Sequence, residues 1–362
     1  MKCIQVGLIG FGFAGRVFQS NVIQAVEGLE LAVIVQRSGS EAATAFPHAR
    51  ILTSVEDLLK DSSIRLVVVA TPNASHLPIA RQCLLADRDV VIDKPFALSS
   101  MEAAELIQLA RARGRLLSVY QNRRWDGDFL TVRKLLENDR LGRLVMFESR
   151  YDRFRQLPRL HAWREDGGPG GGVLWDLGAH LVDQALVLFG VPASVRASVR
   201  MEREGARSDD AFDLCLHYPV SHSQAVPSGL IVWLRATCLA RDPGPRFTLN
   251  GTEGTFRKFG IDCQEAHLLA GDVFSSKPWG VEGPEHWGTL TVDEGGEPES
   301  TRVPTEAGDY RGYYINIRDA IHGNAALEVT PLQAWRTVRV LEMAVASSRT
   351  GSTIPCDWSQ EP

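Results

Sequence analysis

The sequence predicts an α/β protein built from two parts. A glycine-rich turn joins an apolar strand to a helix near the N-terminus, and strands and helices then alternate to about residue 120. Longer strands follow, separated by Gly, Pro and Ser clusters. We therefore expect a doubly wound parallel sheet over residues 1–121 and, over residues 122–362, an α/β domain with an open, mostly antiparallel mixed sheet. A length of 362 residues suits two such domains.

The glycine-rich turn follows the first predicted strand directly. Residues 3–9 are apolar enough for a buried parallel strand, and the string GFGFAG comes next. A helix is expected at about 14–27 and a second strand at 29–35. In this context Gly10 permits the tight turn, Gly12 lets the backbone approach a pyrophosphate, and Gly15 allows close packing of helix on strand. We therefore predict a Rossmann dinucleotide site with a loop containing Gly10, Phe11, Gly12, Phe13, Ala14 and Gly15.

The alternation continues from residue 65. Strands are expected at 65–70, 89–92 and 116–120, with helices at about 76–86 and 99–113. Ligands bind at the carboxyl ends of such parallel strands, so the loop after residue 70 should lie at the cofactor edge. Asn73 is also a residue type that caps helices. The predicted cofactor contacts in this loop are Thr71, Pro72, Asn73 and His76.

The end of the second predicted strand bears on which dinucleotide is bound. Sites for NAD usually place Asp or Glu about 20 residues after the glycines, where it holds the ribose 2′-hydroxyl. This chain has Gln36, Arg37 and Ser38 there. Arg37 could pair with a 2′-phosphate and Ser38 could donate a hydrogen bond to it, although Arg37 could equally be an ordinary surface residue. The sequence favours NADP, with NAD as the alternative.

Two further segments carry polar side chains where chemistry is expected. Asp93 and Lys94 follow the strand at 89–92, where a lysine can polarise a substrate oxygen or simply extend to solvent. In GGGVLWDLGAHLVDQ, at 170–184, Asp176, His180 and Asp183 are spaced to share one helix face. For an isolated Asp-x-x-x-His pair, the more usual interpretation is structural: the acid interacts favourably with the helix dipole near the N-terminus, and the histidine makes a hydrogen bond.

The ordered strings GFGFAG, ATPNASH, DKP and GGGVLWDLGAHLVD resemble the glucose–fructose oxidoreductase, inositol dehydrogenase and rhizopine-catabolism (Gfo/Idh/MocA) family over most of the chain. The strings VVIDKPFALS, YQNRRWDGDF and FESRYDRFR are similar to its NADP-dependent scyllo-inositol dehydrogenase branch. The family usually has Glu where Asp93 stands. The resemblance implies that Lys94, Asp176 and His180 are catalytic and that Asp93 and Lys94 also contact the cofactor.

The implied reaction moves a hydride between nicotinamide and a secondary alcohol or ketone of a cyclitol or sugar, in the first place scyllo-inositol. His180 would take the hydroxyl proton, because imidazole has an ordinary pKa of about 6.5, and Lys94 would stabilise the alkoxide. The alternatives are a keto-sugar or other carbonyl reductase and a non-catalytic NADP-binding sensor or co-repressor. Expected substrate contacts are Lys94, Asn122, Arg123, Trp163, Asp176 and His180, with Arg124, Arg153 and Arg155 as further candidates.

The second half should form a sheet with one face on the helix that carries His180. The other face, with Trp233, Phe212 and Phe247 available, could join another subunit in a homodimer or homotetramer, or be buried within one chain. Residues 275–304 are expected to be a long irregular loop. Two helices, at 311–323 and 331–349, should finish the chain, with Thr330 as N-cap. The last helix could pack back on the first domain.

Composition limits the possible partners. A formal net charge of −5 gives no reason to expect nucleic acid or an anionic membrane. No apolar run approaches the roughly 20 residues of a membrane helix, and the N-terminus does not resemble a signal peptide. The six cysteines show no C-x-x-C pair. We expect reduced thiols, a cytoplasmic location and no metal site.

Overall fold

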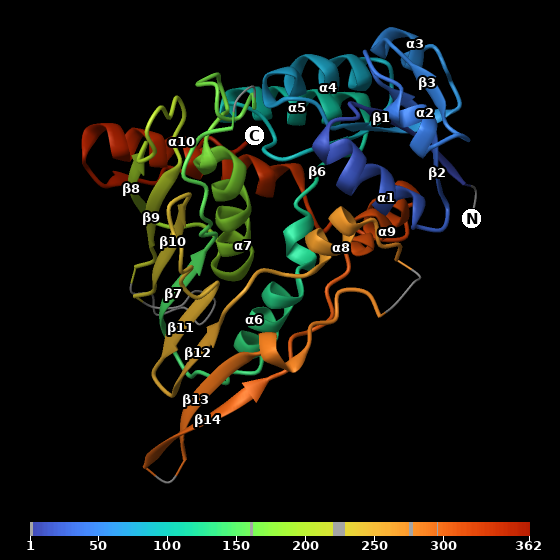
Figure 1. The fold of residues 1–362 in the computed structure, drawn as a ribbon. Coiled ribbons are helices and arrows are strands. Elements are labelled where there is room, and N and C mark those ends of the chain that lie inside the picture. The colour runs from blue at the N-terminus through green and yellow to red at the C-terminus, as the bar shows by residue number, and fades with distance from the viewer. Residues whose placement is uncertain (1–2, 160–161, 220–228, 275–277, 295) are drawn as a thin grey trace.

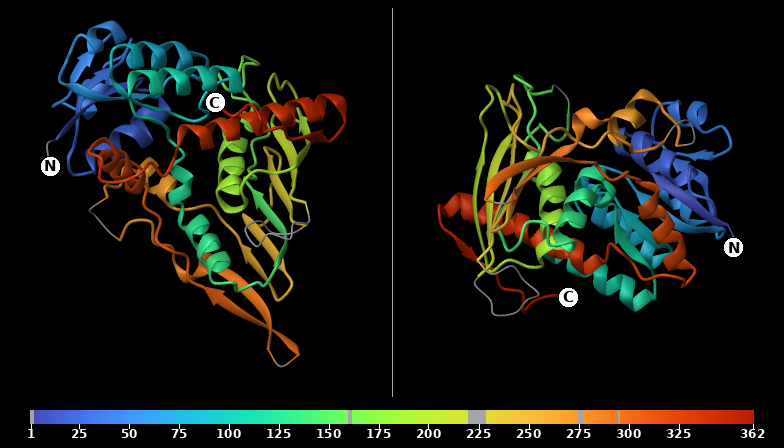
Figure 2. Two further views of the ribbon diagram at one scale, coloured as in Figure 1. Left: turned by 180° about the vertical axis from the view of Figure 1, so that it is seen from behind. Right: turned by 90° about the horizontal axis from the view of Figure 1, so that it is seen from below.

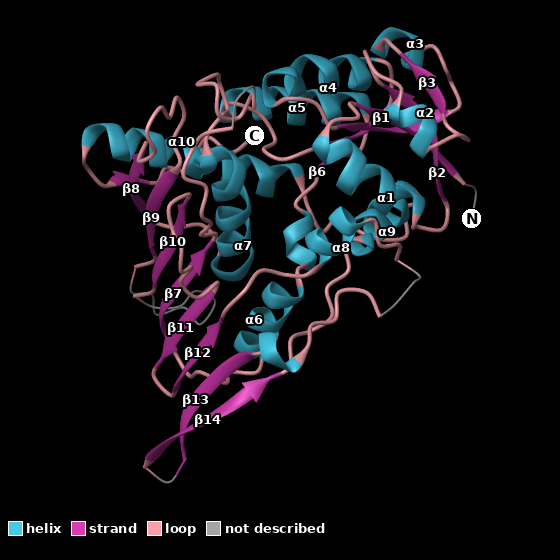
Figure 3. Cartoon of the chain, viewed as in Figure 1, coloured by secondary structure: helices cyan, strands magenta, loops and turns pink. Residues whose placement is uncertain are grey.

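The computed structural model describes residues 3–159, 162–219, 229–274, 278–294 and 296–362, and within them the chain forms two sheets flanked by helices (Figures 1 and 3). The first sheet has six parallel strands in the order β3-β2-β1-β4-β5-β6, as a doubly wound sheet requires. Its strands are β1 (Ile4–Ile9), β2 (Leu29–Val35), β3 (Arg50–Leu52), β4 (Ile64–Val69), β5 (Asp89–Ile92) and β6 (Leu117–Val119).

Helices cover both faces of this sheet because alternate strand residues face opposite sides. Leu66 and Val68 of β4 lie in the core that also contains residues of α1 and α9, whereas Val67 and Val69 lie in the core shared with α4 and α5. Three short elements between β2 and β4 were not predicted, since each has five residues or fewer. The helices are α1 (Ser20–Gln24), α2 (Glu41–Ala45), α3 (Val55–Leu59), α4 (His76–Leu85) and α5 (Ser100–Arg113).

The second sheet has nine strands in the order β14-β13-β12-β11-β7-β10-β9-β8-β15. The pair β7 and β10 is parallel and the other neighbours are antiparallel, which confirms the mixed, mostly antiparallel sheet. Its strands are β7 (Leu144–Arg150), β8 (Ser194–Arg200), β9 (Ala211–His217), β10 (Ile231–Thr237), β11 (Phe247–Gly251), β12 (Gly254–Lys258), β13 (Gly288–Glu294), β14 (Glu297–Val303) and β15 (Ile354–Pro355).

One face of the second sheet packs on α7 (Ala179–Phe189) and α6 (Gly127–Glu137), which Figure 2 shows on the same side. Leu181 of α7 shares a core with Phe212 and Phe247, both fully buried. Of the two possibilities left open for these phenylalanines, burial within one chain is therefore confirmed, and their placement on the outer face was wrong. Side chains alternate between the two faces of a strand, and the positions of these two phenylalanines face α7. Trp233 lies on the other face beside Arg235, whose guanidinium is 5.2 Å from the Trp233 ring centroid.

The prediction of an irregular loop at 275–304 was wrong from residue 288 onward, where β13 and β14 form a hairpin at the edge of the sheet (Figure 1). The side chains of β14 are almost all exposed. A strand that buries so little shows no apolar alternation, and its Glu, Pro and Ser content is typical of a loop. Residues 275–277 and 295 lie outside the described residues.

The C-terminal helices α9 (Arg311–Ile321) and α10 (Pro331–Thr350) join the two halves. Tyr313 of α9 is buried in the first core, and Trp335 of α10 donates a 2.8 Å hydrogen bond to the Ser100 carbonyl at the start of α5. Thr330 is the N-cap of α10, as predicted, in a capping box. Segments beyond residue 310 thus complete the hydrophobic core beside the first sheet. A domain boundary at residue 121 therefore stays a prediction.

A buried ion pair fixes α7 against the segment between the two sheets. Arg124, in the 3₁₀ turn Asn122–Trp125, donates two 2.7 Å hydrogen bonds to Asp183. Both side chains are nearly inaccessible. Asp183 therefore does not share the direction of Asp176, because residues 174–178 form a wider π-helical turn before α7 and shift the angular spacing.

We predict that Asp183→Asn lowers the free energy of unfolding by about 3–5 kcal/mol, because Arg124 then stays buried without a counter-charge. Urea denaturation followed by circular dichroism measures this change. Glu137→Ala is the control, since it removes one end of the exposed Arg133–Glu137 pair and should cost less than about 1 kcal/mol. Equal effects of the two substitutions would contradict the prediction.

Candidate active site

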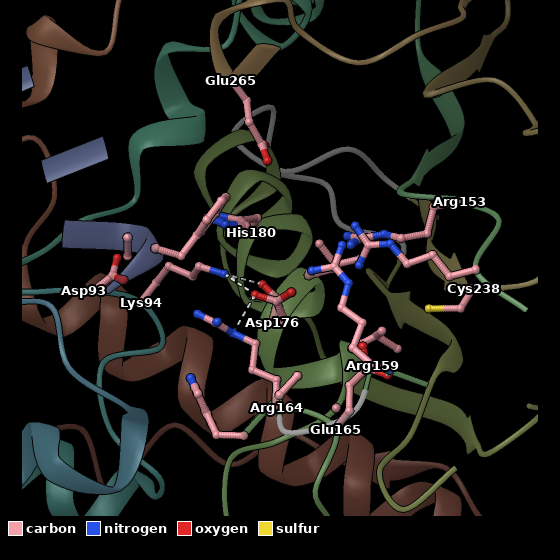
Figure 4. Close-up of a pocket in the computed structure, with 18 of the residues that line it drawn as sticks. Asp93, Lys94, Arg153, Arg159, Arg164, Glu165, Asp176, His180, Cys238 and Glu265 are labelled. Atoms are coloured by element: carbon pink, nitrogen blue, oxygen red, sulfur yellow. Dashed lines mark hydrogen bonds and ion pairs between the residues drawn. The ribbon is translucent and has the colours of Figure 1, made fainter. Parts of the chain in front are cut away.

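A cavity of about 530 Å³ lies between the first domain and the second sheet, and Figure 4 shows its polar side chains. The glycine turn contributes Phe13 and Ala14 from one side, and the helical segment before α7 contributes Asp176 from the other. The structure therefore brings together residues that are more than 150 positions apart. The predicted residues that line the cavity are Phe13, Ala14, Asp93, Lys94, Asn122, Arg123, Arg153, Arg155, Trp163, Asp176 and His180.

The glycine turn has the geometry that a dinucleotide loop needs. Gly10 has φ of +99°, and a Cβ atom there would lie 2.5 Å from the Ala70 carbonyl oxygen. A Cβ on Gly15 would collide with the Gly10 carbonyl oxygen, so only glycine allows the helix to start this close to β1. At Gly12 a Cβ would meet nothing within 4 Å, which leaves open space on the side where a pyrophosphate would approach.

Lys94 and Asp176 form an ion pair across the cavity. The Lys94 ammonium lies 2.7 Å from the Asp176 carboxylate and also 2.7 Å from its backbone carbonyl oxygen. Burial would raise the pKa of Asp176, but the charges of Lys94 and Arg164 outweigh it and hold this pKa well below its usual value. The pair therefore consists of a charged ammonium and a charged carboxylate, and the third N–H of the ammonium is free to meet a ligand.

His180 lies in the same cavity and makes no hydrogen bond within the described residues. Its side chain is buried, and its Nδ1 has no partner there. Burial, followed by the positive charges of Lys94 and Arg123, holds the pKa of His180 well below 6.5. The imidazole is therefore neutral at pH 7, with a lone pair that can accept a proton.

Asn122, Arg123 and Trp163 line the cavity as expected. Arg123 is held by Glu265, 2.5 Å away, and by Asp126, 3.3 Å away, so its charge is already matched. Trp163 is half-buried, and the guanidinium of Arg164 lies 4.5 Å from its ring centroid. These residues form the walls around Lys94 and His180.

The loop after β4 lies beside the cavity rather than in its lining. Thr71 accepts a 2.8 Å hydrogen bond from Ser75, and Pro72 is exposed. Asn73 donates a 2.8 Å hydrogen bond to the Gly170 carbonyl, which ties this loop to the glycines before Asp176. His76 has no exposed surface, and its ring contacts the carbonyl oxygens of Thr71 and Pro95 at 2.9 Å each. His76 therefore holds two loops together from beneath.

Arg37 and Ser38 are exposed after β2, and Arg37 has no ion-pair partner among the described residues. Gln36, at the position where an NAD site would carry an acid, donates a 2.5 Å hydrogen bond to Glu41 and accepts one from the Ala42 N–H. Phe11 packs edge-on against Phe46, with ring centroids 5.9 Å apart. The Arg37 guanidinium is thus free to meet an anion.

Several residues of the cavity were missed from the sequence. Arg159 and Arg203 come from segments without a regular pattern, and Glu265 comes from α8 (Gln264–Ala270), which was not predicted. Tyr120 was only the end of a strand in the sequence, yet its buried hydroxyl lines the cavity without a partner in the described chain. The YDRFR string offered one usable signal, because arginines two apart in an extended strand point to the same side.

Within the described residues, no helix is long and apolar enough to cross a membrane. The same part of the chain contains no group of three or more His, Cys, Asp or Glu side chains arranged to hold a metal ion.

The fold and the cavity define a class: an oxidoreductase with a dinucleotide-binding domain and a separate α/β domain. Residues 4–121 match the family described as an oxidoreductase family with an NAD-binding Rossmann fold, and residues 133–356 match its C-terminal alpha/beta domain. The chain belongs to this Gfo/Idh/MocA family and is an NAD(P)-binding oxidoreductase.

Individual relatives cover nearly the whole chain. The uncharacterized oxidoreductase YdgJ of Escherichia coli is 38% identical over 97% of this chain and 98% of its own. The scyllo-inositol 2-dehydrogenase (NADP(+)) IolW of Bacillus subtilis is 36% identical over 97% of this chain and 95% of its own. The solved structure of yvaA from Bacillus subtilis, described as an oxidoreductase, covers 98% of this chain and 99% of its own, with a TM-score of 0.92 at 34% identity.

We predict that two glycine substitutions in the turn have different effects. Gly15→Ala should lower the free energy of unfolding by about 1–3 kcal/mol, because the new methyl group meets the Gly10 backbone. Gly12→Ala should change it by less than about 0.5 kcal/mol, yet weaken NAD(P)H binding by about tenfold or more, since the methyl group occupies the approach to the pyrophosphate. Urea denaturation and fluorescence titration with NADH and NADPH measure the two quantities. Unchanged binding of both dinucleotides by Gly12→Ala would refute the assignment of the turn.

Proposed function

We propose that this protein transfers a hydride between NADP and a secondary alcohol or ketone of a cyclitol or sugar. The observation that carries the proposal is the convergence of a charged lysine, its carboxylate partner and a neutral histidine in one cavity beside the glycine turn. The 36% identity to a scyllo-inositol 2-dehydrogenase (NADP(+)) makes scyllo-inositol the first substrate to test.

The residues fit a dinucleotide. The open side of Gly12 would receive the pyrophosphate, and the unpaired Arg37 with Ser38 would hold the 2′-phosphate that distinguishes NADP from NAD. When bound, the nicotinamide supplies the hydride acceptor or donor. Phe13 and Ala14, which lie both in the turn and in the cavity lining, are placed to border the nicotinamide end.

The protein's own residues supply the acid–base chemistry. In alcohol oxidation, neutral His180 accepts the hydroxyl proton as the hydride leaves the same carbon. Lys94 donates its free N–H to that oxygen and stabilises the negative charge that develops there. Asp176 accepts a hydrogen bond from the Lys94 ammonium and holds it in the cavity. Reduction of the ketone uses the same groups in reverse, so His180 must first take up a proton and then donates it as the imidazolium.

The alternatives differ in what the cavity would be for. A carbonyl reductase would use the same three residues with the opposite physiological direction. A sensor or co-repressor would bind NADP without turnover, but dinucleotide binding alone gives no reason to desolvate an imidazole beside a lysine at the cavity wall. The depressed pKa of His180 therefore supports the catalytic proposal.

We also propose that the protein forms a homodimer or homotetramer through the outer face of the second sheet. In Figure 2, α6 and α7 lie on the other side of that sheet. The outer face carries half-buried Trp233 and Arg235 beside exposed Ile231. A second copy of this face would cover that apolar area.

The proposal is tested by the absorbance of reduced nicotinamide when the purified protein is mixed with NADP or NAD and a polyol panel. The panel contains scyllo-inositol, myo-inositol, glucose, xylose and their available keto forms. Turnover with NADP and at least one member supports the proposal. NADPH binding without turnover of any alcohol or ketone would reject it in favour of a sensor.

We predict that His180→Ala lowers kcat by about 10²–10⁴-fold while the NADPH dissociation constant is unchanged, because the imidazole acts on the substrate proton. Steady-state kinetics and fluorescence titration measure the two effects. The matched control is His286→Ala, which removes an exposed histidine outside the cavity and should leave kcat unchanged. Full activity of the His180 variant would exclude His180 as the base.

We predict that Arg37→Asp weakens NADP by about tenfold or more relative to NAD, since a carboxylate would then face the 2′-phosphate. The ratio of kcat/KM for the two cofactors measures the preference. Arg81→Asp, which changes an exposed arginine on α4, controls for the altered net charge. An unchanged ratio in the Arg37 variant would reject this arginine as the phosphate contact.

A further inference from the structure

Three arginines gather in the cavity on the side away from the glycine turn. Arg153 and Arg155 continue the direction of β7, and their backbone N–H groups donate to carbonyls of the chain at the end of β10, at 3.0 and 2.7 Å. In such an extended segment residues two apart point to the same side, so Phe154 points away. Arg159 follows in the next loop, and Figure 4 shows Arg153 and Arg159 reaching the same region beside Asp176.

These three guanidinium groups make no direct ion pair with a carboxylate of the described residues, although Asp176 attracts Arg153 and Glu165 attracts Arg155 at longer range. The other cations of the cavity do have direct partners: Lys94 and Arg164 share Asp176, and Arg203 pairs with Asp210. Within the described residues, no ion pair involves Arg153, Arg155 or Arg159. Burial lowers the pKa of Arg155, and the nearby charges of Arg153 and Arg159 lower it further. Three positive charges without a direct ion pair repel one another in a partly buried site, which favours a bound anion.

Arg203 and Glu165 hold the backbone at Leu157 and Arg159 through hydrogen bonds. The buried guanidinium of Arg203 donates to the Leu157 carbonyl at 3.2 Å and to the Glu165 carboxylate at 2.9 Å. The same Glu165 oxygen accepts a 3.0 Å hydrogen bond from the Arg159 N–H. The negative charge of Glu165 is thus engaged by Arg203, and the arginines are presented on a braced segment.

We propose that Arg153, Arg155 and Arg159 form a subsite for an anionic group of the substrate, a carboxylate or a phosphate. The preferred substrate is then an acidic or phosphorylated polyol rather than a neutral one. Guanidinium groups bind both anions through paired N–H donors. The cofactor's phosphates are assigned to the other end of the site, at Gly12 and Arg37. This inference rests on the proposed function, because it identifies the class of substrate for that reaction.

Binding to the NADPH-saturated protein tests the inference without turnover, since a reduced cofactor and an alcohol cannot react. Two matched pairs each add one anion to a ring: methyl β-D-glucoside against methyl β-D-glucuronide, and myo-inositol against myo-inositol 1-phosphate. In isothermal titration calorimetry we expect the anionic member of at least one pair to bind about tenfold tighter or more. The pair that shows the gain distinguishes a carboxylate from a phosphate. No gain in either pair overturns the inference.

The Arg153→Gln/Arg155→Gln double variant should lose that gain, whereas Arg241→Gln should keep it. Arg241 is a matched control because it is exposed and stacks on Phe154, on the side away from the cavity, with its guanidinium 3.9 Å from the ring centroid. In the wild type the gain should also shrink as salt is added. A gain that survives the double variant overturns the assignment. Anion binding together with silence in a turnover assay extended to acidic and phosphorylated polyols and their keto forms would reject the proposed reaction and leave the anion site standing.

Discussion

The contact on which the rest of the site depends is the ion pair between Lys94 and Asp176. Lys94 follows a strand of the first sheet, and Asp176 precedes the helix that packs on the second sheet, so the pair joins the two halves at the cavity. Lys94 keeps Asp176 charged, and Asp176 supplies the counter-charge of Lys94 in a buried place where a lone charge would be costly. The same positive charge disfavours protonation of His180. The Lys94–Asp176 ion pair thus positions the lysine ammonium that would polarise a substrate oxygen, and the charge of that ammonium helps to keep the imidazole of His180 neutral.

Backbone packing places this pair. The collision that a Cβ on Gly15 would make with the Gly10 carbonyl shows how tightly the first helix sits on β1. On the other side, Asn73 bonds Gly170, and the buried Arg124–Asp183 pair holds α7 against the connecting turn. The proposed catalytic residues come from loops and helix starts, and each of those segments is anchored by a buried polar contact. These contacts hold the residues around the Lys94–Asp176 pair from both sides of the cavity.

Sequence patterns predicted the parts of the fold in which burial is periodic. The strands and glycine turn of the first domain have such patterns, and Lys94, Asp176 and His180 were found through ordered motifs rather than spacing alone. The β13–β14 hairpin was missed because an exposed edge strand leaves no apolar alternation. Phe212 was assigned to the wrong face because strand parity can be read only once the register with neighbouring strands is known. Arg159 was missed because an irregular loop carries no pattern that places its side chains.

The central claim is that burial and the neighbouring charge of Lys94 together keep His180 neutral in the site. The direct measurement is an NMR titration of the His180 imidazole in isotope-labelled protein, with the resonance assigned by its loss in His180→Ala. The account predicts a pKa well below 6.5 in the wild type and a higher pKa in Lys94→Gln, since removal of a nearby positive charge favours the imidazolium. A His180 pKa at or above 6.5, or one unaffected by Lys94→Gln, would contradict it.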